Sequence, residues 1–311
     1  MAPRRAAALG GTGSSAAPFL ELGFGARAVA LADAFAAVAD DAAAAHYNPA
    51  GLALPATRDA ARPYELLLSQ ALLIEDVKMT QAAFARRPFA FHITRLSLGG
   101  IEARTAETAA ADSTFGASDL AVGASWGVKA ADIGFGVTGK YINQTIGARS
   151  ASAFAVDLGA LKRFESRPIS LGAALANAGT KIRFIDQAYP LPAVLRLGAA
   201  YGLSKSFPHV ITLQLDLPRD SGPALRLAGE YNGFGPMAIR FGYRTRASAE
   251  RAASVGSALG STASGLTHFY GMTIGTGLRT PYGEFDYALA PYGELGTAHR
   301  LSYTHRFGGA K

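Results

Sequence analysis

The sequence predicts an all-β protein, a closed antiparallel transmembrane β-barrel of about 14 strands. Three observations support this fold class: a period of two along most of the chain, an even number of alternating segments, and links whose lengths alternate. Hydrophobic residues make up 49% of the chain and charged residues 17%, yet no run approaches the 18 apolar residues of a membrane-spanning helix. The best candidate helix, 26–39, contains Asp33 and precedes Asp40 and Asp41, each costing about 3 kcal/mol at a bilayer centre.

From Tyr64 onwards, apolar and polar residues alternate as in strands with one apolar face. In 132–141 one face carries Ile133, Phe135, Val137 and Tyr141, and the other carries Gly134, Gly136, Thr138 and Lys140. The predicted strands are 64–75, 77–87, 88–98, 118–128, 131–146, 152–163, 168–176, 191–203, 208–217, 223–232, 235–244, 267–279, 281–289 and 299–307. An even number allows both ends of a barrel to lie on one side of the membrane.

The links between these strands provide an independent test. Outer-membrane barrels have short periplasmic turns and longer outer loops. Links after even-numbered strands are short, whereas the longest links, 99–117, 177–190, 245–266 and 290–298, all follow odd-numbered strands. Three other odd links are short. The pattern indicates a barrel in a bacterial outer membrane with its long loops outside.

Alternation alone also fits a soluble β-sandwich, which buries its apolar face instead of turning it to lipid. Tyrosines near strand ends are typical of the aromatic girdle at a membrane interface. They are Tyr141, Tyr201, Tyr231, Tyr243, Tyr270, Tyr287 and Tyr303. Sandwich-core aromatics with hydroxyls at the rim are the alternative, so this question stays open here.

A set of charged residues of both signs falls on the face opposite the apolar one. Its members are Lys140, Asp157, Arg196, Asp216, Arg226, Glu230, Arg240, Arg244, Glu284 and Asp286. We expect salt bridges within the lumen that keep the interior filled. Alternatively, Arg196, Arg240 and Arg244 bind an anionic head group such as a fatty-acid carboxylate.

The chain offers no recognisable enzyme motif, and we expect neither enzymatic activity nor a cofactor. Its histidines, His46, His92, His209, His268, His299 and His305, lack metal-binding spacing, and no serine lies in GxSxG. The carboxylates Asp40, Asp41, Glu284 and Asp286 are assigned surface or capping roles. The net charge of +7 is dispersed, which disfavours nucleic-acid binding, and no cysteine is available for a disulfide. The N-terminus lacks the apolar core of a signal peptide, indicating a trimmed signal or a misassigned start.

Several blocks of the sequence resemble the PorV/PorQ family of outer-membrane proteins, relatives of FadL-type hydrophobic transporters. These include Gly25-Ala26-Arg27, 34–41, Tyr47-Asn48-Pro49-Ala50-Gly51-Leu52, 114–121, 153–161, 195–201, Pro218-Arg219-Asp220, Phe241-Gly242-Tyr243-Arg244 and 286–296. The resemblance covers about residues 23 to 307. The final strand, HRLSYTHRF, resembles the terminal strand of such barrels, although Gly308, Gly309, Ala310 and Lys311 follow its last aromatic residue.

The resemblance implies that the N-terminal segment folds inward as a hatch, or plug, and divides the chain into a flexible 1–22, a hatch at 23–63, a barrel at 64–307 and a tail at 308–311. The hatch motif comprises Asp40, Asp41, Tyr47, Asn48, Pro49, Ala50 and Gly51. Physical reasoning agrees, because alanine-rich sequence fits a narrow tube, Pro49 ends a helix over 40–47, and the Asn48 amide can satisfy backbone groups at a reversal. An ordinary helix and turn at a domain edge is the alternative.

The same resemblance implies two possible functions. The first is an accessory or shuttle barrel in protein secretion and surface attachment, whose partners are secreted proteins with a C-terminal signal domain; its chemistry would concentrate in 99–117, 177–190 and 245–266. The second is passive transport of a hydrophobic small molecule, which requires an apolar path past the hatch. Outer-membrane lipid is a partner in both. A soluble β-rich binding protein is a third class.

Overall fold

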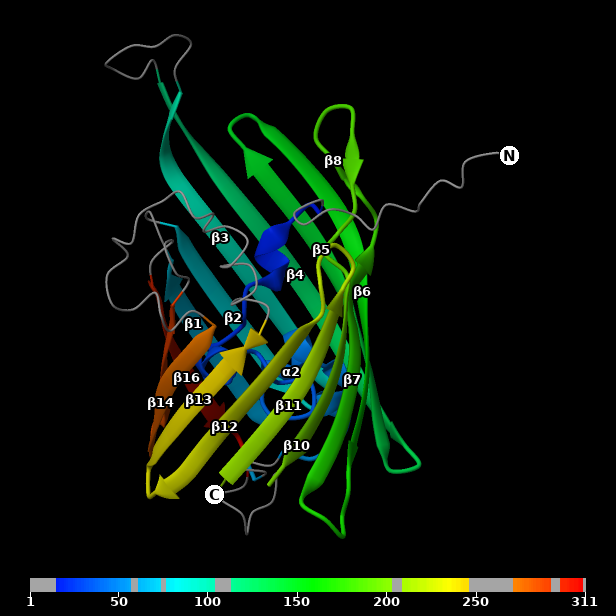
Figure 1. Ribbon diagram of the computed structural model, residues 1–311, viewed down its shortest axis with the longest axis vertical. Helices are drawn as coiled ribbons and strands as arrows, with labels where there is room; N and C mark the ends of the chain where they lie inside the picture. Colours follow the sequence, from blue (N-terminus) through cyan, green and yellow to red (C-terminus); the bar gives the residue numbers. More distant parts are fainter. Residues whose placement is uncertain are drawn as a thin grey trace.

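The computed structural model describes residues 15–56, 61–73, 77–103, 113–202, 209–245, 271–291 and 297–309. Fourteen strands form one closed antiparallel barrel, in which each strand pairs with its neighbours in the chain and the first pairs with the last (Figure 1). They are β1 (Tyr64–Leu72), β2 (Lys78–Arg86), β3 (Phe89–Ala103), β4 (Ser113–Ala130), β5 (Ile133–Ile146), β6 (Arg149–Arg163), β7 (Ile169–Gly179), β10 (Val194–Tyr201), β11 (His209–Pro218), β12 (Ala224–Phe234), β13 (Met237–Arg244), β14 (Met272–Thr280), β15 (Gly283–Pro291) and β16 (Thr297–Phe307). The predicted fold class is therefore confirmed.

All fourteen predicted strands have a counterpart, but two long links are shorter than expected. β3 continues to Ala103 and β4 begins at Ser113, so most of the predicted loop 99–117 is strand. The reason is a register shift between Leu98 and Ile101, where Gly100 has a φ of 72°. A bulge of this kind interrupts the alternation without ending the strand pairing. The predicted loop 245–266 lies outside the described residues from 246 onwards.

The predicted loop 177–190 also contains structure. β7 continues to Gly179, and a separate two-stranded hairpin follows, made of β8 (Ile182–Arg183) and β9 (Ala188–Tyr189). At the last long link, β15 extends to Pro291 and β16 starts at Thr297. β8 and β9 have two residues each, which is too few for a period of two to be read from sequence.

The two faces of the barrel wall differ in the way a membrane barrel requires. Outward residues are apolar and exposed, including Phe154 at 64% and Leu301 at 62%, whereas inward polar residues such as Thr138 and Arg240 are fully buried. A soluble sandwich would bury the apolar face instead. Because the barrel is closed, it also has no free strand edge. These two facts exclude the sandwich.

The wall is not equally tall around its circumference. The strands β3 to β6 have 14 to 18 residues, while β1, β2, β14 and β15 have 9 each. About 9 to 11 tilted residues suffice to cross a bilayer. The longer strands exceed this length and extend past the shorter ones at the end that carries the long links, as the upper part of Figure 1 shows.

The N-terminal segment contains four short helices: η1 (Pro18–Glu21), α1 (Ala26–Ala30), α2 (Ala44–Tyr47) and η2 (Pro49–Ala53). In the part of the chain that the structure describes, no helix has the length and apolar character to cross a membrane. Within the predicted flexible terminus 1–22, residues Pro18–Glu21 form η1, whose Phe19 and Leu20 are buried against Ile142 and Leu191. Burial of these apolar side chains outweighs the entropy of ordering the segment.

Candidate functional site

The N-terminal segment runs through the lumen from one end to the other (Figure 1). At the end with the long links, Ala16 N donates to Pro190 O at 2.9 Å and Ala17 N donates to Gln144 Oε1 at 3.1 Å. At the end with the short links, Arg163 donates to Pro55 O at 2.8 Å. Between these points nearly every residue from Phe24 to Leu54 is buried. The interior of the barrel is thus filled by its own chain.

The Tyr47–Gly51 stretch reverses the chain against the wall. α2 ends at Tyr47, as expected from Pro49, although it begins at Ala44 rather than at Asp40. The Asn48 side chain accepts a hydrogen bond from Ala50 N at 3.2 Å, which caps η2. Its amide nitrogen donates to Ala36 O within the segment at 2.7 Å and to Ala160 O on β6 at 3.1 Å. One side chain therefore joins two parts of the segment to the barrel.

Several glycines lie in the wall beside this reversal. A Cβ on Gly159 would lie 2.1 Å from Asn48 Oδ1, and one on Gly136 would lie 2.2 Å from the Pro49 carbonyl carbon. Real side chains do not approach so closely, so these positions allow the two backbones to come together only because they are glycine.

The Tyr47 hydroxyl fastens a different part of the segment. It donates to Asp33 Oδ1 at 2.6 Å and accepts from Phe24 N at 2.8 Å. Burial, followed by the charge of Asp33, raises the pKa of Tyr47 well above its ordinary value. The hydroxyl remains a neutral donor.

Arg27 is the centre of the largest ion-pair network. Its guanidinium lies 2.5 Å from Asp40 Oδ1, 2.8 Å from Asp41 Oδ2 and 2.9 Å from Glu230 Oε2 on β12. Burial opposes its charge, but Asp40, Glu230 and Asp41 together hold the pKa of Arg27 well above its ordinary value. Of the surface or capping role expected for Asp40 and Asp41, the surface part is wrong because both are buried, whereas Asp41 does cap the turn by accepting from Ala43 N.

The network continues into the wall through Arg240. Its guanidinium contacts Glu230 at 2.7 Å, Asp286 at 2.5 Å and Glu284 at 3.4 Å. Arg306 then connects Glu284 to Glu65, whose carboxylate accepts from Ala42 N. Glu284 and Asp286 therefore form buried ion pairs, as expected for the inward-facing charged set, and the surface or capping role also considered for them is wrong.

Two smaller clusters lie elsewhere in the lumen. Lys140 on β5 contacts Asp157 on β6 at 2.6 Å and Asn177 at 2.8 Å. Arg226 contacts Asp216 at 2.7 Å and reaches into the segment to Asp33 at 3.2 Å. Buried charges of this kind are tolerated because each has a partner and further hydrogen bonds.

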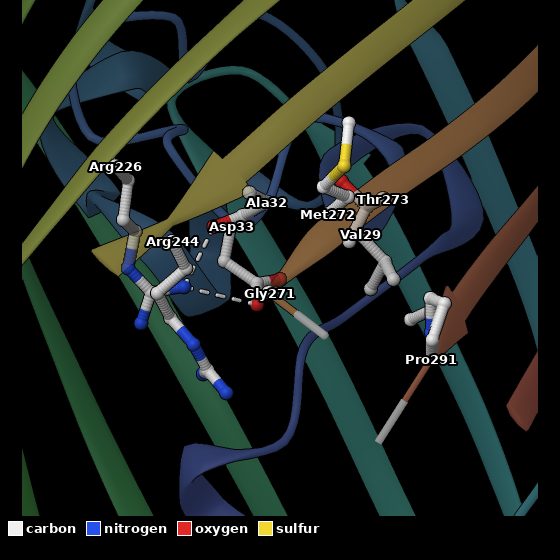
Figure 2. A pocket seen from close by; sticks show the side chains of 10 residues that line it. Val29, Ala32, Asp33, Arg226, Arg244, Gly271, Met272, Thr273 and Pro291 are labelled. Carbon is white, nitrogen blue, oxygen red and sulfur yellow. Dashed lines mark hydrogen bonds and ion pairs between the residues drawn. The ribbon is translucent and has the colours of Figure 1, made fainter. Parts of the chain in front are cut away.

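The three arginines considered for an anionic head group differ in their surroundings. Arg240 is occupied by three carboxylates, and Arg196 donates weakly to the carbonyl of Tyr47 and lies 5.7 Å from its ring centroid. Arg244 is half-buried and lines a cavity of about 30 Å³ beside Arg226 and Asp33, with Val29, Met272 and Pro291 on the other side (Figure 2). A cavity of this size holds little more than a water molecule.

Sequence reasoning missed Arg27, Glu65, Arg300 and Arg306, which are all buried or nearly so. One signal was available for Arg27, since a lone arginine in an alanine-rich apolar segment must find a carboxylate if it is buried. Within the described ranges, no three His, Asp or Glu side chains come together as metal ligands.

A closed barrel with an apolar outer wall and an interior filled by its own N-terminal segment is an outer-membrane β-barrel. The chain matches the family model of the type IX secretion system protein PorV over residues 11–219, and it belongs to this family. A comparison with curated proteins gave no match.

Solved structures with a similar fold are hydrocarbon channels and a FadL homologue. The chain is similar to the CymD monoaromatic hydrocarbon channel, with a TM-score of 0.61 and 11% identity over 92% of this chain and 98% of that one. It is also similar to the Pseudomonas putida toluene transporter TodX (0.57, 11%, 93% and 99%) and to a Pseudomonas aeruginosa FadL homologue (0.53, 12%, 91% and 98%). At such identities the likeness concerns the fold.

Proposed function

We propose that this barrel is a non-enzymatic accessory of type IX secretion that receives the C-terminal signal domain of a secreted protein at its outer loops and carries it to surface attachment. The filled lumen is the observation that supports this role most directly. Arg27 ties the segment to Glu230, and Asn48 ties it to Ala160, so a solute could pass only after these buried contacts break. A secreted protein that binds at the outer loops requires no such opening of the lumen. Membership of the PorV family supports the same role.

The tall side of the wall is the part of the rim that suits a protein partner. β3 to β6 rise beyond the length that a bilayer requires, and the β8–β9 hairpin lies in the link beside them. The hairpin exposes Ile185 at 62% and Tyr189 at 44%. Exposed apolar and aromatic side chains above the membrane are typical of protein contact sites.

Gentle purification from native outer membranes, followed by mass spectrometry of protein and lipid, tests this function. Secreted proteins that share a C-terminal domain are the expected co-purifying species. Bound hydrophobic molecules without protein partners would refute the accessory role, and recovery of the chain from the soluble fraction would refute a membrane role altogether.

A matched pair of variants makes the test specific to the rim. Deletion of residues 181–189 removes the hairpin and should abolish recovery of the secreted partner. The control replaces the opposite turn, Ala131 and Asp132, with Asn-Gly, since both residues already have positive φ. Equal loss of the partner in both variants would contradict a role for the hairpin.

Passive transport of hydrophobic compounds is the second candidate, and the fold shared with hydrocarbon channels favours it. It requires the segment to move, because its buried contacts to Glu230 and Ala160 hold it across the lumen. Uptake by cells should then rise when Arg27 is replaced, whereas recovery of a secreted partner should not.

A further inference from the structure

The outward face of the barrel carries an uneven set of charges. Among the strand residues whose side chains the structure describes, four outward positions hold Asp, Glu, Lys or Arg, and all four are basic: Lys78, Arg86, Arg95 and Lys162. Arg86 and Lys162 lie near the end with the short links. Lys78 and Arg95 lie towards the end with the long links.

These two pairs differ in their neighbours. Arg86 lies over the Tyr64 ring at 5.7 Å, and Lys162 lies over the Phe164 ring at 5.1 Å, so each is satisfied by a cation–π contact. Lys78 and Arg95 are both exposed, and neither has an ionic, aromatic or hydrogen-bonding partner for its side chain among the described residues.

Strand register brings Lys78 and Arg95 together. Lys78 is opposite Ser97, and Thr80 is opposite Arg95, so the two bases are diagonal neighbours about 7 Å apart. Lys78 begins the nine-residue strand β2, a length that a bilayer crossing uses in full, so we place Lys78 at the membrane interface and Arg95 one row deeper. A long arginine side chain at that depth extends its guanidinium to the interface.

An apolar groove begins beside this pair on the same outer wall. It crosses β2, β1, β16, β15 and β14, measures about 580 Å³, and is lined by residues including Ala82, Leu68, Leu301, Tyr303, Phe285 and Leu278. Its upper edge carries Thr80, which donates to Gln70 Oε1 at 2.7 Å. Thr80 adjoins both bases, so the polar edge of the groove and the basic pair are continuous.

We propose that this face binds a lipid with a phosphorylated headgroup, whose phosphate contacts Lys78 and Arg95 and whose acyl chain lies in the groove. Two adjacent cations with no partner among the described residues match the charge of a phosphate, and the arginine fork matches its oxygens. The groove volume falls within the range of small-ligand sites. Its place on the membrane-facing wall specifies a bilayer lipid as the occupant.

Native mass spectrometry of the full-length barrel in neutral detergent tests the site, with phosphatidylglycerol and phosphatidylcholine of identical acyl chains as probes. The variant K78Q/R95Q removes the basic pair. The control R86Q/K162Q removes the two ring-covered bases and changes net charge equally. A third variant, Ala82→Trp, fills the groove and leaves both charges in place.

The wild-type barrel and the control should bind phosphatidylglycerol in preference to phosphatidylcholine. Each removed charge should lower the affinity for phosphatidylglycerol about fivefold. The K78Q/R95Q variant should therefore bind this lipid about 25-fold more weakly and lose the preference for it over phosphatidylcholine. Ala82→Trp should lower the affinity for both lipids, because it fills the groove that holds the acyl chain. Only species that stay folded in unheated detergent are compared, which separates binding from misfolding.

Three results would overturn the proposal. Equal binding by K78Q/R95Q and by the control would exclude the basic pair, and an unaffected Ala82→Trp variant would exclude the groove. If inorganic phosphate alone binds as tightly as the lipid, the site recognises a free anion and the lipid assignment is wrong.

Discussion

Replacement of Arg27 with methionine should release the N-terminal segment from the wall far more often than in the natural chain. The substitution keeps an unbranched side chain but leaves Asp40, Asp41 and part of Glu230 buried without a counter-charge. Removing one partner of a buried ion pair costs about 3 to 5 kcal/mol. Arg240 continues to compensate Glu230, so we take the lower value, about 3 kcal/mol.

A loss of about 3 kcal/mol raises the opening equilibrium constant about a hundredfold. The chain has no cysteine, so a single engineered thiol reports opening without background. Ala43→Cys places that thiol at a position with 2% exposure, and Tyr282→Cys provides an exposed reference at 78%. Maleimide labelling of Cys at position 43, divided by that at 282, should increase about a hundredfold in the Arg27→Met variant.

Two further variants test the physical cause. Arg27→Lys keeps the charge but loses the forked geometry, and it should give an intermediate labelling rate. Adding Asp40→Asn to Arg27→Met removes one of the uncompensated carboxylates, and it should recover part of the loss. If the labelling ratio changes less than about threefold in Arg27→Met, the ion pairs do not hold the segment and this reasoning fails.

Three other predictions concern the same segment and use the same labelling ratio. Gly159→Ala should increase opening, because the added methyl group overpacks against Asn48 at a cost of about 1 to 3 kcal/mol. Gly139→Ala is the control and should not increase opening, because nothing lies within 4 Å of a Cβ at that position. Equal effects of the two substitutions would contradict the close approach at Gly159. Asn48→Ala should increase opening by about 1 to 3 kcal/mol, since buried carbonyls lose their donor; an unchanged ratio would refute this. Burial, and next the charge of Lys140, hold the pKa of His46 well below its ordinary value of 6.5. Below pH 6.5 the histidine takes up a proton only when the segment is released, so the segment is held most stably above that pH. Opening should therefore rise about tenfold for each pH unit below 6.5. His46→Phe should show a flatter pH profile, and an identical slope would exclude His46 as the cause.

The period of two determined much of this protein without any coordinates. It fixes which residues of a strand share a face, so the inward positions of Lys140, Asp157 and Arg240 follow from their spacing alone. The alternating link lengths likewise follow from barrel topology. The missed extensions of β3 and β4 have the opposite cause, because a bulge shifts the period and makes a strand resemble a loop.

Only the tertiary structure decided which charges meet. Arg27 and Glu230 are 203 residues apart, and nothing in either sequence neighbourhood specifies the other. Their contact requires the barrel to close, the register of β12 to be set and the N-terminal segment to run through the lumen. Arg196, Arg240 and Arg244 look alike in sequence, yet they lie over a tyrosine ring, among three carboxylates and beside a small cavity, respectively. A strand period gives the face on which a side chain lies, but its neighbours depend on where an irregular segment packs.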